Sequence, residues 1–115
     1  MGGDIPELFG QWERFTAWLF GKTAGFPSRL RHSLTARIEA RALDVHEALV
    51  GARFNVNRTA ALQQINLDLD RLRLLLRLAH DLQALDHRAF QYACAELDSA
   101  GRMVGGWLRH ERAPR

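Results

Sequence analysis

Histidines and one cysteine are the residues of this 115-residue sequence best suited to metal or covalent chemistry. No two histidines have the spacing of helical metal ligands, and Cys94 alone cannot form a disulfide framework or a thiolate metal site. No serine lies in a nucleophile elbow, and no glycine-rich phosphate loop is present. We therefore expect no catalysis, metal, cofactor or small-molecule substrate. The histidines are His32, His46, His80, His87 and His110.

One enzymatic pattern is left, in the segment Arg41-Ala42-Leu43-Asp44-Val45-His46. Its arginine-to-histidine spacing matches that of helical HEPN ribonucleases. With fifteen arginines and five histidines in 115 residues, chance alone gives about two such matches over the allowed spacings. The residue after Arg41 is alanine, where that family has a polar residue. A ribonuclease that uses Arg41 and His46 is therefore kept only as a lesser alternative.

Arginine is the abundant polar group, with fifteen arginines, one lysine and a net charge of +3. Guanidinium groups favour bidentate contacts with phosphates and carboxylates, although a GC-rich genome would produce the same bias. Arg37 and Arg41 lie one helical turn apart, and only Asp44 is placed to offset them. With Arg29 and Arg31 they form the best candidate for an anion-binding patch, and ordinary surface charge is the alternative.

Two further arginines, Arg73 and Arg77, lie in a polar strip with Asp70 and Asp81. Their spacing places acids and bases beside one another along a helix. We expect a row of solvated ion pairs there, with phosphate binding as the alternative.

Apolar residues recur at steps of three and four in four segments, and no segment alternates like a strand. Glycines at 21 and 25, a cap at Asn57 or Thr59 and a cap at Asp86 separate the segments. The sequence predicts an all-α, antiparallel up-and-down four-helix bundle in a single domain, 1–115, with helices at roughly 5–20, 28–53, 58–84 and 87–109. No signal peptide or membrane span is recognisable, so we expect a cytoplasmic protein without a membrane partner.

The third predicted helix is apolar on two sides. One seam suits a bundle core and consists of Leu62, Ile65, Leu69, Leu72, Leu76 and Ala79. A second set lies about 150° around the same helix and consists of Leu67, Leu74, Leu78, Leu82 and Leu85. Because four helices provide no central position, this second face predicts a homo-oligomer or an obligate partner, and the alternative is a monomer with an exposed leucine patch.

Glycines at 101, 105 and 106 fall inside the fourth predicted helix. Each costs helix stability of about 1 kcal/mol. Their spacing indicates a close approach of another helix or backbone.

Several segments together resemble one family, the accessory variability determinant (Avd) proteins of diversity-generating retroelements. They are the leucine-rich segment 72–82, Tyr92 and, most specifically, Gly101-Arg102-Met103-Val104-Gly105-Gly106-Trp107-Leu108. Trp18-Leu19 and Phe26-Pro27 with Arg31 also fit, so the likeness covers nearly the whole chain. The connector near Asn55 matches least.

The resemblance implies a four-helix bundle that assembles into a basic, pentameric barrel and binds the retroelement's reverse transcriptase and nucleic acid. Such a protein has no catalysis of its own, and it supports error-prone copying of template RNA into cDNA that replaces a variable region of a target gene. Two departures concern partner contacts: Asp98-Ser99-Ala100 replaces an acid-apolar pair before Gly101, and the sequence ends soon after Trp107.

By position, the resemblance and the charge pattern assign partner or anion contacts to Arg29, Arg31, Arg37, Arg41, Arg73, Arg77 and Arg102. The expected interface between copies consists of the second leucine set with Gly101, Gly105 and Trp107. The main alternative is a four-helix protein of the type encoded in ribosomal RNA intervening sequences, which shares the architecture and RNA binding but lacks the Gly-Gly-Trp signature.

Overall fold

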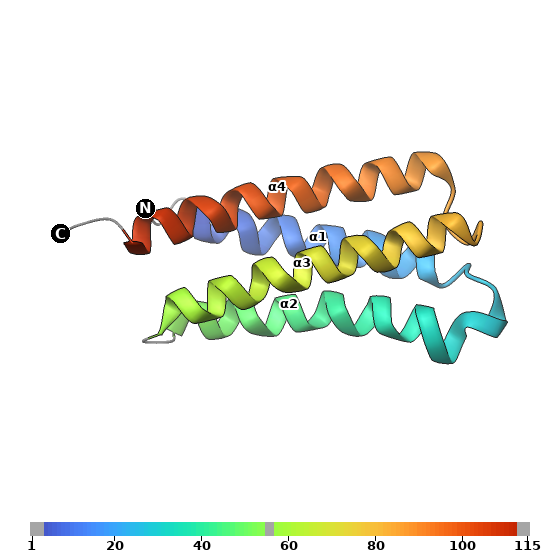
Figure 1. The fold of residues 1–115 in the computed structure, drawn as a ribbon, viewed down its shortest axis with the longest axis horizontal. Coiled ribbons are helices and arrows are strands. Elements are labelled where there is room, and N and C mark those ends of the chain that lie inside the picture. Colours follow the sequence, from blue (N-terminus) through green and yellow to red (C-terminus); the bar gives the residue numbers. More distant parts are fainter. Residues whose placement is uncertain (1–3, 55–56, 113–115) are drawn as a thin grey trace.

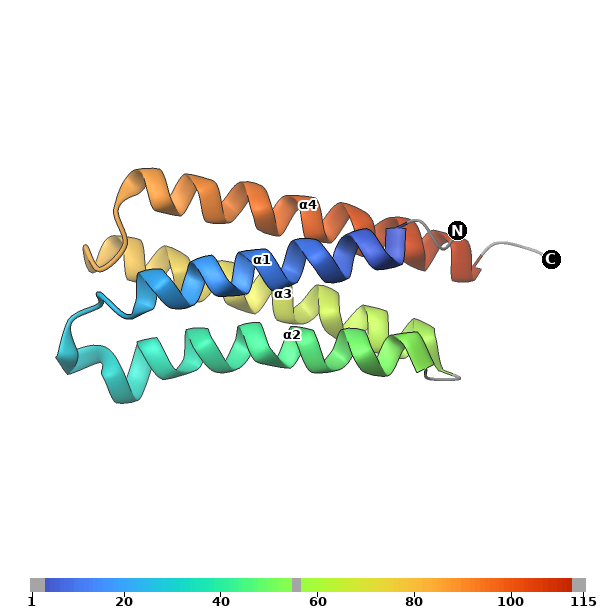
Figure 2. The ribbon, with the colours of Figure 1, turned by 180° about the vertical axis from the view of Figure 1, so that it is seen from behind.

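The computed structural model describes residues 4–54 and 57–112. These residues form four α-helices and no strand: α1 (Asp4–Thr23), α2 (Ala36–Phe54), α3 (Arg58–Asp81) and α4 (His87–Arg112). Each helix packs against two neighbours, in the cyclic order α1, α2, α3, α4 (Figure 1). Consecutive helices run in opposite directions, as the view from behind also shows (Figure 2). The predicted all-α four-helix architecture is confirmed.

The core lies between the inner faces of the four helices. The inner seam of α3 is buried along its whole length, as the apolar periodicity predicts. Large aromatic side chains from the other helices fill the space opposite it, among them Trp12, Phe15 and Trp107. The indole N–H of Trp12 donates a hydrogen bond of 3.0 Å to the carbonyl of Ala42, which ties α1 to α2 in the buried interior.

The helix predicted at 28–53 is not one regular α-helix. Pro27 opens a 3₁₀ turn, η1 (Ser28–Leu30), and a π-helical turn, η2 (Arg31–Thr35), follows before α2 begins. A π-helix is wider than an α-helix because it closes hydrogen bonds between residues five apart. The wider turn accommodates Leu30, Leu34 and Ile38, four residues apart, all on the buried side.

The prediction that the third helix reaches residue 84 is also wrong, because α3 ends at Asp81. Gln83 has a φ of 63°, in the left-handed region. The N–H of Ala84 donates to the carbonyl of Ala79 at 2.9 Å, and that of Gln83 donates to the carbonyl of His80 at 3.0 Å. This is the Schellman arrangement that ends helices, usually with glycine at the left-handed position.

The remaining helix ends lie close to the predicted ones: α1 extends to Thr23, α2 to Phe54 and α4 to Arg112. The side chain of Asn57 accepts the N–H of Ala60, and that of Asp86 accepts the N–H of Ala89, so both residues cap the following helices. Most of the connector near Asn55, at residues 55–56, lies outside the described residues. None of the described helices combines the length and apolar character that crossing a membrane requires.

The α1–α2 and α3–α4 connections lie at the same end of the bundle (Figure 1). We call this the linker end.

Candidate functional site

Three of the predicted anion-binding arginines lie near the linker end. Arg29 belongs to η1, Arg31 to η2 and Arg37 to the first turn of α2, and all three side chains are exposed. None of them forms an ion pair with another residue of the described ranges 4–54 and 57–112. Their charges therefore stay available to an external anion.

Arg41 is in a different position from these three. Its Nη1 atom lies 3.4 Å from a carboxylate oxygen of Asp44 and 3.4 Å from one of Asp68. The prediction that only Asp44 offsets this arginine is therefore wrong. Asp68 is buried, and it also accepts hydrogen bonds from the side chains of Gln64 at 3.2 Å and Arg71 at 3.4 Å. The guanidinium of Arg41 thus compensates a buried carboxylate between α2 and α3, and it is a poorer anion site than the sequence suggests.

The ion pairs expected along α3 are replaced by a contact between helices. Arg73 donates to Asp98 of α4 at 2.7 Å, with both side chains partly exposed. Arg77 is exposed and has no ion pair within the described part of the chain. Asp81 lies 3.9 Å from His80, so the predicted row along the helix is wrong.

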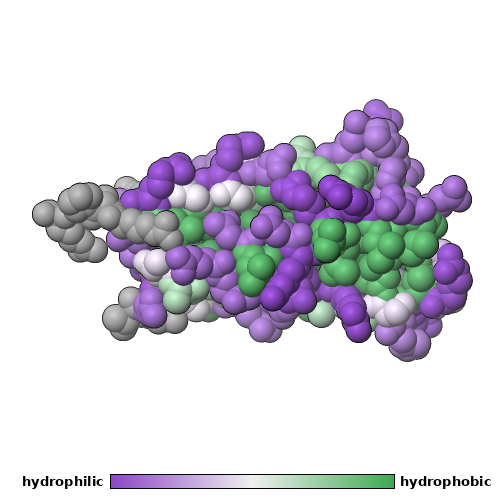
Figure 3. All heavy atoms as spheres, in the orientation of Figure 1, coloured by the Kyte–Doolittle hydropathy of each residue, from purple (hydrophilic) through white to green (hydrophobic). Residues whose placement is uncertain are grey.

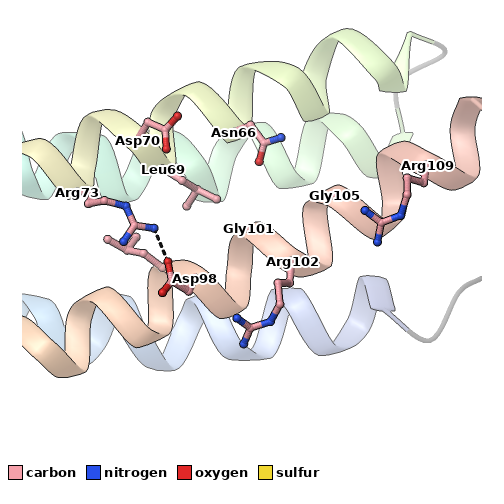
Figure 4. A pocket seen from close by; sticks show the side chains of 10 residues that line it. Asn66, Leu69, Asp70, Arg73, Asp98, Gly101, Arg102, Gly105 and Arg109 are labelled. Atoms are coloured by element: carbon pink, nitrogen blue, oxygen red, sulfur yellow. Dashed lines mark hydrogen bonds and ion pairs between the residues drawn. The ribbon is translucent and has the colours of Figure 1, made fainter.

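A groove of about 530 Å³ runs between α3 and α4. Arg73, Asp98, Arg102 and Arg109 line it, and the Arg73–Asp98 pair bridges it near one end (Figure 4). Figure 4 shows the backbone of Gly101 and Gly105 along the α4 side of this groove.

The two groove glycines leave space that the chain itself does not fill. A Cβ atom on Gly101 would meet no atom within 4 Å, and one on Gly105 would meet only the end of the Arg109 side chain at 3.5 Å. At Gly101 and Gly105, the predicted close approach is therefore not made by another part of the described chain. The space is open to a partner's side chain or backbone.

The second apolar face of α3 is exposed in the isolated chain. Leu74 is 65% exposed, and the face also includes Leu67, Leu78 and Leu82. We call these four residues the outer leucine row. On the surface shown in Figure 3, apolar side chains form a broad patch over the second half of α3.

Two residues predicted for this interface do not belong to it. Leu85 is only 2% exposed, because the left-handed turn at Gln83 breaks the helical phase and directs Leu85 into the core. Trp107 is 0% exposed and lies within the core cluster of the bundle. The guanidinium of Arg58 covers its ring at 5.3 Å. Both side chains stabilise the fold of the single chain.

Sequence reasoning missed an apolar row on α2. Leu43, Val50 and Phe54 are exposed, Phe54 by 77%. Their steps of seven and four residues place them on one face of the helix, opposite its buried stripe. The same periodicity argument that identifies the outer row of α3 would have found them.

The structure does not bring Arg41 and His46 together. Five residues correspond to about 140° around an α-helix, so the two side chains leave α2 on different sides. Arg41 reaches Asp68 on α3, whereas His46 Nε2 lies 3.0 Å from the hydroxyl of Thr16 on α1. Burial lowers the pKa of His46, and the nearby carboxylate of Glu13 opposes that shift.

Metal binding gains no support from the geometry. Among the described residues, no three histidine, cysteine or carboxylate side chains are grouped so that they could hold a metal ion.

Comparison with known proteins identifies one family. A family model described as bAvd-like matches residues 8–111 of the chain. The match spans all four helices and includes the groove glycines. Among curated proteins, no sequence matches.

Proposed function

This chain belongs to the bAvd-like family, and we propose that it is the non-catalytic accessory protein of a diversity-generating retroelement. In this role it binds the element's reverse transcriptase together with the template RNA or its cDNA, and it acts as a homo-oligomer, a pentamer. The family match over 104 of the 115 residues is the observation that carries the proposal.

The charge of the linker end supports the nucleic-acid part of this function. Arg29, Arg31 and Arg37 are exposed there without carboxylate partners in the described ranges, and Arg77 lies near the same end of α3. Phosphate backbones bind such clusters through displacement of counterions, so affinity depends steeply on salt.

The outer leucine row supports the homo-oligomer. Contiguous exposed apolar patches are uncommon on soluble monomers unless they bind something. A copy of the same chain offers a matching apolar face, and the open groove beside α3 offers polar groups to the edge of such an interface.

Nucleic-acid binding is tested by salt titration with a short RNA. The double variant Arg31→Gln/Arg37→Gln should bind more weakly and lower the slope of log K against log salt by about one for each phosphate that is no longer bound. The control, Arg53→Gln/Arg71→Gln, removes the same charge away from the linker end and should leave the slope nearly unchanged. Equal slopes in the two variants would contradict a binding surface at the linker end.

The reverse transcriptase is the decisive partner. We expect its gene beside the gene of this chain, and we expect the two proteins to copurify when they are co-expressed. Sedimentation should give five times the 13.1 kDa chain mass. A monomer at micromolar concentration, or the absence of a neighbouring reverse-transcriptase gene, would overturn the corresponding part of the proposal.

A further inference from the structure

A second hollow, of about 200 Å³, lies between α1 and α4 close to the linker end. It is separate from the α3–α4 groove, and it contains none of the arginines named above. The residues that line it are Trp18, Lys22, Asp86, Arg88, Ala89 and Tyr92.

Two aromatic rings form one wall of this hollow. The ring centroids of Trp18 and Tyr92 lie 4.5 Å apart at an interplanar angle of 54°. Trp18 stacks against Phe15 of the core, with centroids 5.7 Å apart, and this contact holds its ring in place. Tyr92 is 44% exposed, and its hydroxyl makes no hydrogen bond within the described part of the chain. The two rings therefore form an aromatic surface that packs against the core through Trp18 and is exposed to solvent at Tyr92.

Two cations lie beside these rings. The Nζ atom of Lys22 lies 5.7 Å from the centroid of Trp18. Arg88, also exposed, lines the hollow one turn before Tyr92 on α4. No residue in the described ranges forms an ion pair with Lys22 or Arg88.

The one carboxylate that lines the hollow already has a structural role. An oxygen of Asp86 accepts the backbone N–H of Ala89 at 2.8 Å, as the cap of α4. Two cations, Lys22 and Arg88, thus face a single carboxylate among the lining residues. The local charge favours an anionic ligand.

A purely structural role explains only part of this arrangement. A ring that merely fills the contact between α1 and α4 is expected to be buried, as Trp12 and Phe15 are. Tyr92 instead exposes nearly half of its surface beside two cations without carboxylate partners in the described ranges. Exposed aromatic rings flanked by basic side chains are the usual platform for single-stranded nucleic acid, because bases stack on the rings and phosphates contact the cations.

We propose that this hollow binds single-stranded nucleic acid, with an unpaired base stacked on the exposed ring of Tyr92 and in edge contact with Trp18, and with the adjacent phosphates on Lys22 and Arg88. The inference rests on the proposed nucleic-acid binding of the chain, and it assigns that binding a second surface beyond the arginines at the linker end. Duplexes do not fit this mode, because their bases are already stacked on one another. RNA and DNA single strands share the chemistry that the hollow recognises.

The test uses the full chain with fluorescently labelled oligo(U), oligo(dT) and a duplex of equal length. Single strands should bind more tightly than the duplex, as measured by fluorescence anisotropy. Tyr92→Leu should weaken single-strand binding by about 10-fold or more, whereas Tyr92→Phe, which keeps the ring, should bind like the original chain. Lys22→Gln/Arg88→Gln should lower the salt dependence of single-strand binding.

Tryptophan fluorescence provides an independent measurement. Trp12 and Trp107 are fully buried, so a stacked base can quench only Trp18 by contact. Unlabelled single strands should quench part of the emission of the original chain, and Trp18→Phe should abolish this change. The control variant Phe54→Leu alters an exposed aromatic ring at the last residue of α2, at the end of the bundle opposite the linker end. It should change neither the binding of single strands nor the quenching.

The outcomes separate this inference from the proposed function. If the chain binds nucleic acid but Tyr92→Leu and Trp18→Phe change nothing, the hollow is not the site, and the proposed function stands. Equal binding of duplex and single strand would also overturn the inference. So would altered sedimentation of the Tyr92→Leu variant, because the hollow would then be an interface between copies. If no nucleic acid binds at all, both proposals fail.

Discussion

The inner and outer faces of α3 place the same side chain in opposite surroundings. Leu72 is completely buried against the other helices, whereas Leu74, two residues further along, is 65% exposed. The two rows come from the same stretch of sequence, and they lie on opposite sides of one helix. The fold of one chain accounts for the burial of the inner row, whereas the outer row stays exposed in the isolated chain.

Polar residues separate these two faces along both borders of the helix. On the α2 side the border is Asp68, buried and bonded to Arg41, and on the α4 side it is Arg73, which pairs with the exposed Asp98. One border is thus part of the interior and the other is at the surface. Substitutions in each face and each border can test this division.

The largest effect should come from the inner row. Leu72→Ala should lower the free energy of unfolding by about 2–5 kcal/mol, because it leaves a cavity in a close-packed core. Leu74→Ala removes the same atoms from the outer row. In urea unfolding, the destabilisation of Leu72→Ala should be independent of protein concentration, whereas any destabilisation of Leu74→Ala should shrink on dilution as copies dissociate. Equal, concentration-independent effects would remove the distinction between the two faces.

The second largest effect should be a difference in stability between substitutions at the two borders. Asp68→Ala should lower the free energy of unfolding by about 2 kcal/mol, because it removes a buried acceptor of three donors. The matched variant Asp98→Ala breaks only an exposed ion pair and should cost about 0.2–1 kcal/mol. Urea unfolding of both variants measures the difference. A cost for Asp98→Ala equal to that for Asp68→Ala would show that the α4 border is interior as well.

The outer row should determine association. Leu74→Ser should weaken self-association by about 10-fold, the effect of removing one buried leucine from an interface. Sedimentation at several concentrations measures it, and Val50→Ser serves as the comparison on the exposed row of α2. If only Leu74→Ser weakens self-association, the interface is confined to α3. If Val50→Ser weakens it as well, the interface extends to α2. An unchanged distribution in Leu74→Ser would contradict an interface on this row.

The smallest effect should come from pH, which acts on the α1–α2 contact and leaves both faces of α3 alone. Burial lowers the pKa of His46, so the folded chain binds a proton less readily than the unfolded chain. Stability should therefore be fully present above the ordinary value of 6.5 and decrease as the pH falls below it. Thermal unfolding of His46→Gln should show a shallower decrease over that range. An identical pH profile would exclude His46 as its source.

Periodicity predicts the helices and both faces of α3, because burial of one stripe is a property of a single helix. The periodicity gives wrong predictions where the regular turn of about 100° from residue to residue is interrupted. Leu85 follows a left-handed residue that is glutamine rather than glycine, so no residue type signals that α3 ends at Asp81. The π-helical turn before α2 is equally invisible, since Leu30 and Leu34 also fit an α-helix.

Contacts between helices are the other limit. Arg41 pairs with Asp68, and Arg73 pairs with Asp98, 27 and 25 residues away in sequence. Spacing within one helix pairs each arginine only with its own neighbours, so it predicts Asp70 for Arg73. The hollow between α1 and α4 is missed for the same reason, because Trp18 and Tyr92 meet only after the chain has folded.

The lysine in that hollow has a practical consequence. Lys22 is the one lysine of the sequence, which has fifteen arginines. Amine-directed reagents therefore have a single side-chain target, beside the ring of Trp18. A dye or cross-linker attached there would report on whatever occupies the surface between α1 and α4, without any engineered attachment point.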